Sequence, residues 1–156
     1  MARYRTWSED PPPGFTLLEL LVVTLIIGTL STMAAPSLQR AREQAQVGAA
    51  IAELRIIQSE LAIYIEINFG PPVSLAAIDR AGLIDPWGYT YIYNPLTGGG
   101  AGQARKDKFM VPLNTDYDLY SVGLDGKSKS PLSAKDSKDD VIRALDGAYF
   151  GLAEDF

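Results

Sequence analysis

The 156-residue sequence contains neither cysteine nor histidine. Without cysteine, the chain has no disulfide framework and no thiolate metal site. Without histidine, it has no Ser-His or Cys-His catalytic pair and no imidazole-bound zinc. It also lacks the side chain whose ordinary pKa best suits acid–base catalysis near neutral pH. We therefore expect a protein that is not an enzyme.

Basic residues are in the minority, since 14 Lys and Arg stand against 19 Asp and Glu, and the formal net charge is −5. A protein that binds nucleic acid through its phosphates usually carries a basic face or stripe. We therefore expect no nucleic acid among the partners of this chain. The length allows one modest globular domain besides an N-terminal extension.

Charge is scarcest between Phe15 and Gln39, a stretch of 25 residues whose one charged residue is Glu19. At a helical rise of about 1.5 Å per residue, such a stretch can cross a hydrocarbon layer of roughly 30 Å. We predict a transmembrane helix over residues 15–35. Pro36 follows, and a proline inside a helix removes one hydrogen bond and clashes with the preceding turn. We therefore predict a helix break at Pro36, as a kink or local melting.

Residues 36–69 are predicted to continue as an amphipathic helix. Apolar residues recur at helical spacing and form one stripe, which comprises Ala50, Leu54, Ile57, Leu61, Tyr64 and Ile65. Gly70-Pro71-Pro72 should end this helix, because neither residue type continues one comfortably. The stripe is expected to pack against a globular domain formed by residues 70–156.

Short elements are predicted within the globular domain. Ser74 to Ile84 is predicted to be a short helix with Ser74 as its N-cap, followed by a turn at Asp85-Pro86-Trp87-Gly88. Three segments are predicted strands, at residues 89–93, 109–113 and 117–122. The fold class predicted from these elements is α+β, with a long N-terminal helix packed on a small antiparallel sheet.

Seven aspartates crowd the segment between Asp116 and Asp146, which also holds four lysines and one arginine. The residues alone leave two interpretations open, a solvated loop of balanced charge and a metal site. An EF-hand is excluded, because the Asp-x-Asx-x-Asx-Gly pattern with a glutamate in its twelfth position does not occur.

The stretch from Gly14 to Glu19, Gly-Phe-Thr-Leu-Leu-Glu, resembles the N-terminal signal of type IV pilins and type II secretion pseudopilins. This resemblance implies that residues 1–14 are a leader peptide, which prepilin peptidase removes between Gly14 and Phe15 before it methylates Phe15. Glu19 would be the fifth residue of the mature chain, where the family has its glutamate.

The implied role of Glu19 is to set the filament register by pairing with the α-amino group of Phe15 in a neighbouring subunit. A carboxylate within the bilayer costs about 2.5–3.5 kcal/mol on insertion scales, so a partner charge there is physically reasonable. The alternative from the residues alone is a glutamate that favours the positive end of its own helix and lies close to the headgroups.

Two further segments resemble the major pseudopilin, the G subunit of type II secretion systems. One is the Asp-Pro-Trp-Gly turn, and the other is Ser121-Val122-Gly123-Leu124-Asp125-Gly126 with the later pair Asp139-Asp140. The second resembles the calcium loop of that family. The resemblance implies a Ca²⁺ ion, which takes six to eight oxygen ligands. The implied ligands are the carboxylates of Asp125, Asp139 and Asp140 and the carbonyls near Val122 and Ile142.

The function implied by the resemblance is that of a structural subunit, which polymerises into a periplasmic pseudopilus filament and drives protein export by a type II secretion system. The implied partners are further copies of the chain, minor pseudopilins, prepilin peptidase and an inner-membrane assembly platform. Before assembly the chain would be a single-pass protein of the bacterial inner membrane, with its globular domain in the periplasm. Two alternatives stay open: a major or minor subunit of a type IV pilus for adhesion, motility or DNA uptake, and a single-pass anchored domain that binds or catalyses without polymerising.

Overall fold

The computed structural model describes residues 14–97 and 100–156, without the side chains of residues 33–34 and 100–101. Apart from Gly14, the predicted leader therefore lies outside the described residues. The chain divides into two compact units, Met1–Ala41 and Arg42–Phe156.

The helix α1 spans Leu17–Asn68 and enters both units. The helix continues through Pro36. The predicted local melting at this proline is therefore wrong. A kink at Pro36 stays a prediction. Within the first unit, the large apolar side chains of α1 are exposed.

The stretch of α1 in the second unit confirms the predicted amphipathic pattern. Ala50, Leu54, Ile57 and Leu61 are completely buried, as their helical spacing requires of one face. The helix ends at Asn68, and Phe69 then adopts a left-handed conformation with φ of 58°, before Gly70 and the two prolines that cannot continue a helix. The position of the helix end was therefore predicted correctly.

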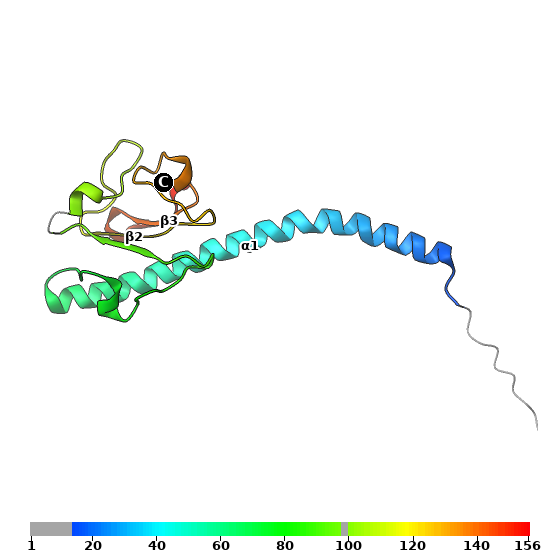
Figure 1. Ribbon diagram of the computed structural model, residues 1–156, viewed down its shortest axis with the longest axis horizontal. Helices are drawn as coiled ribbons and strands as arrows, with labels where there is room; N and C mark the ends of the chain where they lie inside the picture. Colours follow the sequence, from blue (N-terminus) through cyan, green and yellow to red (C-terminus); the bar gives the residue numbers. More distant parts are fainter. Residues whose placement is uncertain (1–13, 98–99) are drawn as a thin grey trace, which may run out of the picture. The chain divides into compact units, whose positions relative to one another are not determined.

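Four short strands form one antiparallel sheet in the order β1-β2-β3-β4, of which the inner strands β2 and β3 are labelled in Figure 1. The strands are β1 (Ile92–Pro95), β2 (Tyr117–Ser121), β3 (Val141–Ala144) and β4 (Tyr149–Leu152). Short 3-10 turns connect the remaining segments, at Leu75–Ile78, Gly100–Gln103, Lys135–Ser137, Leu145–Gly147 and Ala153–Asp155. The helix and the sheet together confirm the predicted α+β class.

Successive side chains of the central strands point to opposite faces of the sheet, so two apolar clusters form, one on each face. Leu119 and Val141 pack with the buried stripe of α1, whereas Ile142 and Ala144 point to the opposite face and pack with Leu113 and others. This is the two-residue period of a strand, in which successive side chains point to opposite faces. The sheet therefore has one face on the helix and one on the loops between residues 104 and 140.

Polar contacts also tie α1 to the sheet. Arg143 of β3 donates from Nε to the side-chain oxygen of Gln58 on α1, at 2.5 Å. Its two Nη atoms donate to both carboxylate oxygens of Asp116, at 2.8 and 2.7 Å, and its guanidinium lies 4.0 Å from the centre of the Tyr117 ring. The arginine thereby replaces its hydration shell with fixed partners.

Three predicted elements differ from the structure. The segment 109–113 is not a strand, because Asp107 Oδ1 accepts hydrogen bonds from the N–H groups of Phe109 and Val111 and folds it into a turn. The segment 74–84 holds only the 3-10 turn Leu75–Ile78; Ser74 makes no side-chain capping bond, and Asp79 ends the turn in a left-handed conformation. The first strand begins at Ile92 instead of residue 89, because Asp85 holds Tyr89 in the preceding turn.

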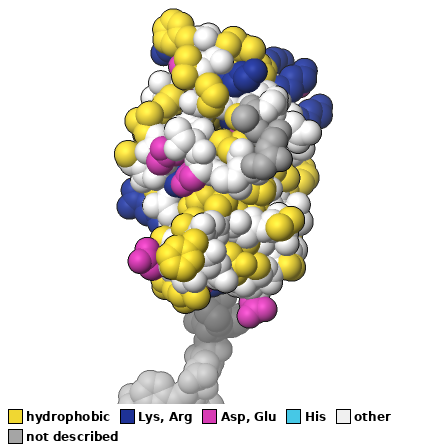
Figure 2. All heavy atoms as spheres, turned by 90° about the vertical axis from the view of Figure 1, so that its left-hand side faces the viewer, with side chains coloured by type: hydrophobic (Ala, Val, Ile, Leu, Met, Phe, Trp, Pro, Cys, Tyr) yellow, Lys and Arg dark blue, Asp and Glu magenta, His cyan; other side chains and the backbone are white. Residues whose placement is uncertain are grey.

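Figure 2 shows one face of the molecule, on which hydrophobic side chains are spread among polar ones and most of the visible Lys and Arg side chains lie toward the upper right. Strongly exposed apolar residues of the second unit include Phe69, Val73 and Phe109. Some exposed apolar residues are normal on a domain surface. The continuous apolar exposure of the first unit is the unusual feature of the described chain.

Candidate functional site

The predicted cleavage junction lies directly before α1. Gly14, Phe15 and Thr16 belong to no helix or strand, and Phe15 is 84% exposed. Exposed backbone outside regular secondary structure is where proteases cut most readily. The local structure is therefore compatible with cleavage between Gly14 and Phe15, which stays a prediction.

Thr16 and Glu19 form a reciprocal capping box on the first turn of α1. The Glu19 carboxylate accepts hydrogen bonds from the Thr16 N–H at 2.8 Å and from the Thr16 hydroxyl at 2.9 Å, and the Thr16 hydroxyl oxygen accepts the Glu19 N–H at 3.2 Å. The start of a helix leaves several N–H groups without partners, and this arrangement satisfies two donors. Glu19 thus has a local role as a cap, and its role in filament register stays a prediction.

The stretch of α1 that follows is apolar on all sides. Its large apolar side chains are between 43% exposed at Val22 and 88% exposed at Leu17. By length and composition, α1 can cross a membrane. Hydroxyl groups within the stretch are satisfied inside the helix, since Thr24 and Thr29 donate to the carbonyls of Leu21 and Ile26. Such internal pairing suits an apolar environment, where water cannot supply a partner.

The segment between β2 and β3, residues 122–140, is called the acidic loop below. In this loop, Asp125 and Asp139 lie next to each other. Asp139 Oδ2 accepts the Asp125 N–H at 2.9 Å, and Asp125 Oδ1 accepts the Lys127 N–H at 2.8 Å. Gly123 permits this approach, because its φ is +66° and a Cβ at this position would lie 2.2 Å from the Asp139 carbonyl oxygen. A side chain at position 123 would therefore push the two segments apart.

Asp140 is fully buried, and its carboxylate faces an internal cation. Its Oδ2 lies 2.6 Å from Nη2 of Arg105 and accepts a second hydrogen bond from the Ser128 hydroxyl, also at 2.6 Å. Burial raises the pKa of Asp140 to about 6, against the opposing influence of Arg105 and Ser128. The carboxylate is paired within the protein by Arg105 and Ser128.

The two predicted carbonyl ligands differ in their surroundings. Val122 directly follows β2, whereas Ile142 lies inside β3 between Tyr120 of β2 and Gly151 of β4. The carbonyl of a residue in an inner strand is used in the hydrogen-bond ladder, which makes Ile142 the poorer ligand. Within residues 14–97 and 100–156, no three acidic side chains are grouped so that they could hold a metal ion. In these positions the residues do not fit a three-carboxylate calcium site, and calcium stays a prediction.

Asp85 joins the Asp-Pro-Trp-Gly turn to the acidic loop. Its Oδ1 accepts the N–H groups of Trp87 and Tyr89, at 3.0 and 2.8 Å. Its Oδ2 accepts the Ser121 hydroxyl at 2.5 Å, and the Ser121 oxygen in turn accepts the Gly123 N–H at 3.1 Å. The two segments that carried the resemblance are therefore one hydrogen-bonded structure, in which the fully buried Ser121 is a structural link.

Arg105 and Ser128 were not predicted from the sequence. Arg105 stands in the run Ala104-Arg105-Lys106-Asp107-Lys108, and alternating charges of this kind are typical of a solvated surface. Its burial follows from the path of the surrounding loops, for which the sequence has no periodic signal.

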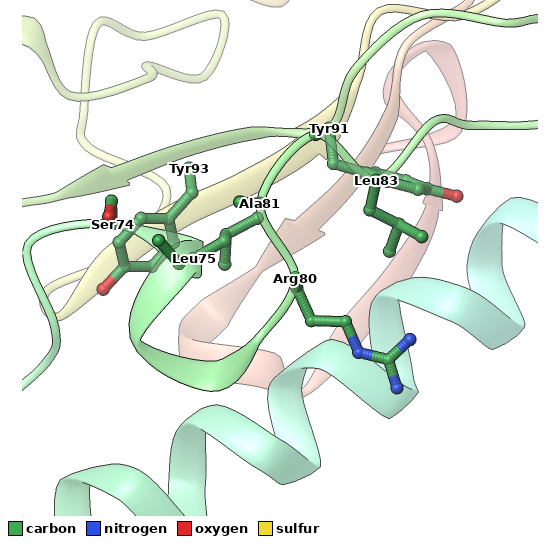
Figure 3. Close-up of a pocket in the computed structure, with 9 residues that line it drawn as sticks. Ser74, Leu75, Arg80, Ala81, Leu83, Tyr91 and Tyr93 are labelled. Carbon is green, nitrogen blue, oxygen red and sulfur yellow. The ribbon is translucent and has the colours of Figure 1, made fainter.

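A separate hollow lies between the segment 74–83 and the first strand (Figure 3). Arg80 extends from it toward α1 and pairs with Glu60, with Nη2 2.5 Å from Oε1 and Nε 2.8 Å from Oε2. The Tyr91 and Tyr93 hydroxyls donate to Glu53 and to the Pro72 carbonyl, both at 2.9 Å. These groups already hold the segment to its neighbours, so we interpret the hollow as a packing feature.

The N-terminal segment matches the family model for the prokaryotic N-terminal methylation motif over residues 13–35. This match covers the Gly14-Phe15 junction, the capping box and the apolar stretch up to Ala35. It agrees with the resemblance found in the sequence. No solved structure gave a significant match.

Similarity to known proteins extends over most of the chain. The chain is 30% identical over 135 residues to the type II secretion system core protein G of Klebsiella pneumoniae, and this alignment covers 82% of this chain and 91% of that protein. It is 29% identical to the core protein G of Escherichia coli over 153 residues, covering 78% and 99% of the two chains. For the core protein G of Pseudomonas aeruginosa, the identity is 29% over 135 residues, covering 73% and 84%. The chain belongs to the family of type II secretion system core protein G.

Proposed function

We propose that this chain is the structural subunit of a periplasmic pseudopilus, which polymerises and thereby drives protein export by a type II secretion system. The observation that carries this proposal is the first stretch of α1, which exposes apolar side chains around its whole circumference. A helix that is apolar on all sides must be covered by lipid or by other apolar helices. Membrane insertion before assembly and helix packing after it are the two environments that satisfy this need.

The relatives support this function over the type IV pilus alternative. Each of the relatives reported above is a core protein G, and the similarity includes the globular domain as well as the N-terminal motif. The motif alone would not distinguish between the two kinds of filament. The proposed location follows from the same relationship: a single-pass protein of the inner membrane, with residues 42–156 on the periplasmic side.

Assembly is proposed to begin with removal of residues 1–14 and methylation of Phe15 by prepilin peptidase. The new α-amino group would lie one residue before Thr16, whose N–H already binds the Glu19 carboxylate. In the filament, Glu19 of one subunit would pair with the α-amino group of the next, because an ion pair compensates a charge that lipid or packed helices do not solvate. Minor pseudopilins and an inner-membrane assembly platform are the further partners proposed.

Calcium at the acidic loop is a separate part of the proposal. Asp125 and Asp139 are neighbours, and Val122 precedes Asp125 in the same turn-forming segment of the sequence. A calcium ion needs six to eight oxygens, so water and other carbonyls would have to complete the shell. Asp140 already uses Oδ2 to accept from Arg105 and Ser128, so only its Oδ1 would be left for such a shell.

The filament proposal is tested with two substitutions that separate the charge of Glu19 from its capping role. Glu19→Gln keeps an oxygen that can accept the Thr16 bonds but removes the charge, whereas Thr16→Ala removes the capping hydroxyl and keeps the charge. With the chain co-produced with its secretion system, we expect Glu19→Gln to remain in the membrane fraction while filaments and export fall to background. The Thr16→Ala variant should still assemble.

The measurements are filament counts by electron microscopy and the amount of an exported protein in the medium. Normal filaments from Glu19→Gln together with few from Thr16→Ala would reject the register role and leave Glu19 as a cap. An absence of filaments from the unaltered chain under conditions of active export would reject the filament proposal itself.

A further inference from the structure

Arg105 lies deep in the domain although it comes from a run of charged residues. Its side chain is 4% exposed, and that of its partner Asp140 is completely buried. Nη2 donates to Asp140 at 2.6 Å, and Nη1 donates to the Ser128 hydroxyl at 2.5 Å. Ser128 donates in turn to the same oxygen of Asp140 at 2.6 Å, so the three side chains form a closed ring of hydrogen bonds.

The position of Arg105 is fixed by its backbone as well. Its N–H donates to Asp118 Oδ2 at 2.7 Å, and its carbonyl accepts the Leu113 N–H at 2.9 Å. Its guanidinium lies 4.0 Å from the centre of the Tyr120 ring, within the range of a cation–π contact. Arg105 is therefore held in place from three directions, and its contact with Asp140 is not that of a mobile surface side chain.

A buried carboxylate needs a cation close to it, because the protein interior solvates charge poorly. A metal ion and a guanidinium are two ways to meet this need, and the second requires nothing from solution. We propose that Arg105 is the built-in cation for Asp140. Asp140 then lies outside any metal shell, and the segments around residues 105, 128 and 140 fold without a divalent ion.

This proposal differs from the ligand set implied by the resemblance, in which Asp140 was one of three carboxylates. It is independent of the filament function, and it allows calcium at Asp125 and Asp139. Two atoms of the pair, Asp140 Oδ1 and Arg105 Nε, are buried without a hydrogen-bond partner in the described part of the chain. Oδ1 is the atom through which a metal ion would have to reach Asp140, so the experiment must measure the response to calcium directly.

The experiment compares the thermal unfolding of the detergent-solubilised full chain in excess chelator and in excess calcium chloride, followed by near-ultraviolet circular dichroism. The variants are Asp140→Asn, Arg105→Gln and the two combined, with Asp125→Asn as the matched control at a predicted ligand outside the pair. In chelator, we expect each single variant of the pair to lower the melting temperature by about 10 °C or more, because it leaves one buried charge uncompensated. The combined variant should lower the melting temperature by less than the sum of the decreases caused by the two single variants.

The response to calcium distinguishes a built-in cation from a metal ligand. We expect the calcium-induced shift in melting temperature to be the same in Asp140→Asn as in the unaltered chain, and to be reduced only in Asp125→Asn. Equal melting curves with and without calcium in every variant would reject calcium at Asp125 and Asp139 but would still support Arg105 as the cation.

The proposal is overturned by a calcium-induced shift that disappears in Asp140→Asn, or by an Arg105→Gln variant that unfolds like the unaltered chain in chelator. Arg105→Lys covers the case in which Arg105→Gln gives no cooperative transition. Lysine keeps the cation but cannot reproduce the paired bonds to Asp140 and Ser128, so its melting temperature should lie between those of the unaltered chain and Asp140→Asn. A melting temperature for Arg105→Lys no higher than that of Asp140→Asn would contradict the proposal.

Discussion

Leu25 and Leu54 are the same residue type in the same helix, but Leu25 is 64% exposed whereas Leu54 is completely buried. The stretch around Leu54 carries apolar residues on one face only, and the sheet of its own chain covers that face. The stretch around Leu25 is apolar on every face, and no described residue of its own unit covers it. One half of α1 is therefore stabilised within the chain, while the other exposes apolar surface that its own unit does not cover.

The largest expected effect that tests this comparison comes from shortening the two leucines. Leu54→Ala should lower the free energy of unfolding of the globular domain by about 2–5 kcal/mol, because it leaves a cavity between helix and sheet. Leu25→Ala should leave that free energy unchanged. Denaturant unfolding of the full chain in mild detergent measures both, and equal losses from the two variants would contradict the division of α1.

A smaller effect is expected from the polar link between α1 and the sheet. Gln58→Met keeps the side-chain length but leaves Arg143 Nε without its acceptor, which should cost about 1–3 kcal/mol of unfolding free energy. The matched control is Thr24→Val, which removes a hydroxyl bonded only within its own helix. Unfolding of Gln58→Met indistinguishable from that of the control would show that Arg143 contributes nothing through this bond.

The smallest effect is expected from the partly exposed pair of Glu60 and Arg80. Glu60→Gln should lower the denaturation midpoint slightly at low salt and less at high salt, because solvent and ions screen such pairs. The hydrogen bond from Arg80 lowers the pKa of Glu60, so the contribution is complete above the ordinary pKa of a glutamate. It is lost as the pH falls through the lowered pKa.

The control for that pair is Glu66→Gln, at an exposed glutamate on the same helix. The measurement is the denaturation midpoint as a function of salt and pH. A decrease in the midpoint from the unaltered chain to Glu60→Gln that is the same at low and high salt would show that the contact acts through packing instead of charge.

The elements predicted well from the sequence are those with a regular period. Ala50 to Leu61 follow the helical spacing, and the structure buries that stripe as predicted. The strand at residues 117–122 was nearly correct, since β2 covers Tyr117–Ser121. The segment 109–113 has a strand-like composition too, but the Asp107 side chain captures its N–H groups. A single side-chain acceptor thus outweighed a weak preference for a strand.

The candidate sites also divide into features with a local sequence pattern and features without one. The capping box of Thr16 and Glu19 was not predicted, although its three-residue spacing is a local pattern. The environment of Asp140 has no such pattern. Its partner Arg105 is 35 residues away along the chain and arrives in a loop without periodic pattern.

The sequence by itself determined the apolar span, the buried stripe of α1 and the resemblance to the family, because each depends on residues at fixed local spacing. Only the tertiary structure decided which partner each charged side chain meets inside the domain. Asp85 reaches Ser121, Arg143 reaches Gln58, and Arg105 reaches Asp140 across separations that no local rule governs. The physical reason is that a buried charge must pair with a polar group that the folded loops place beside it. The paths of those loops are fixed only when the apolar clusters pack.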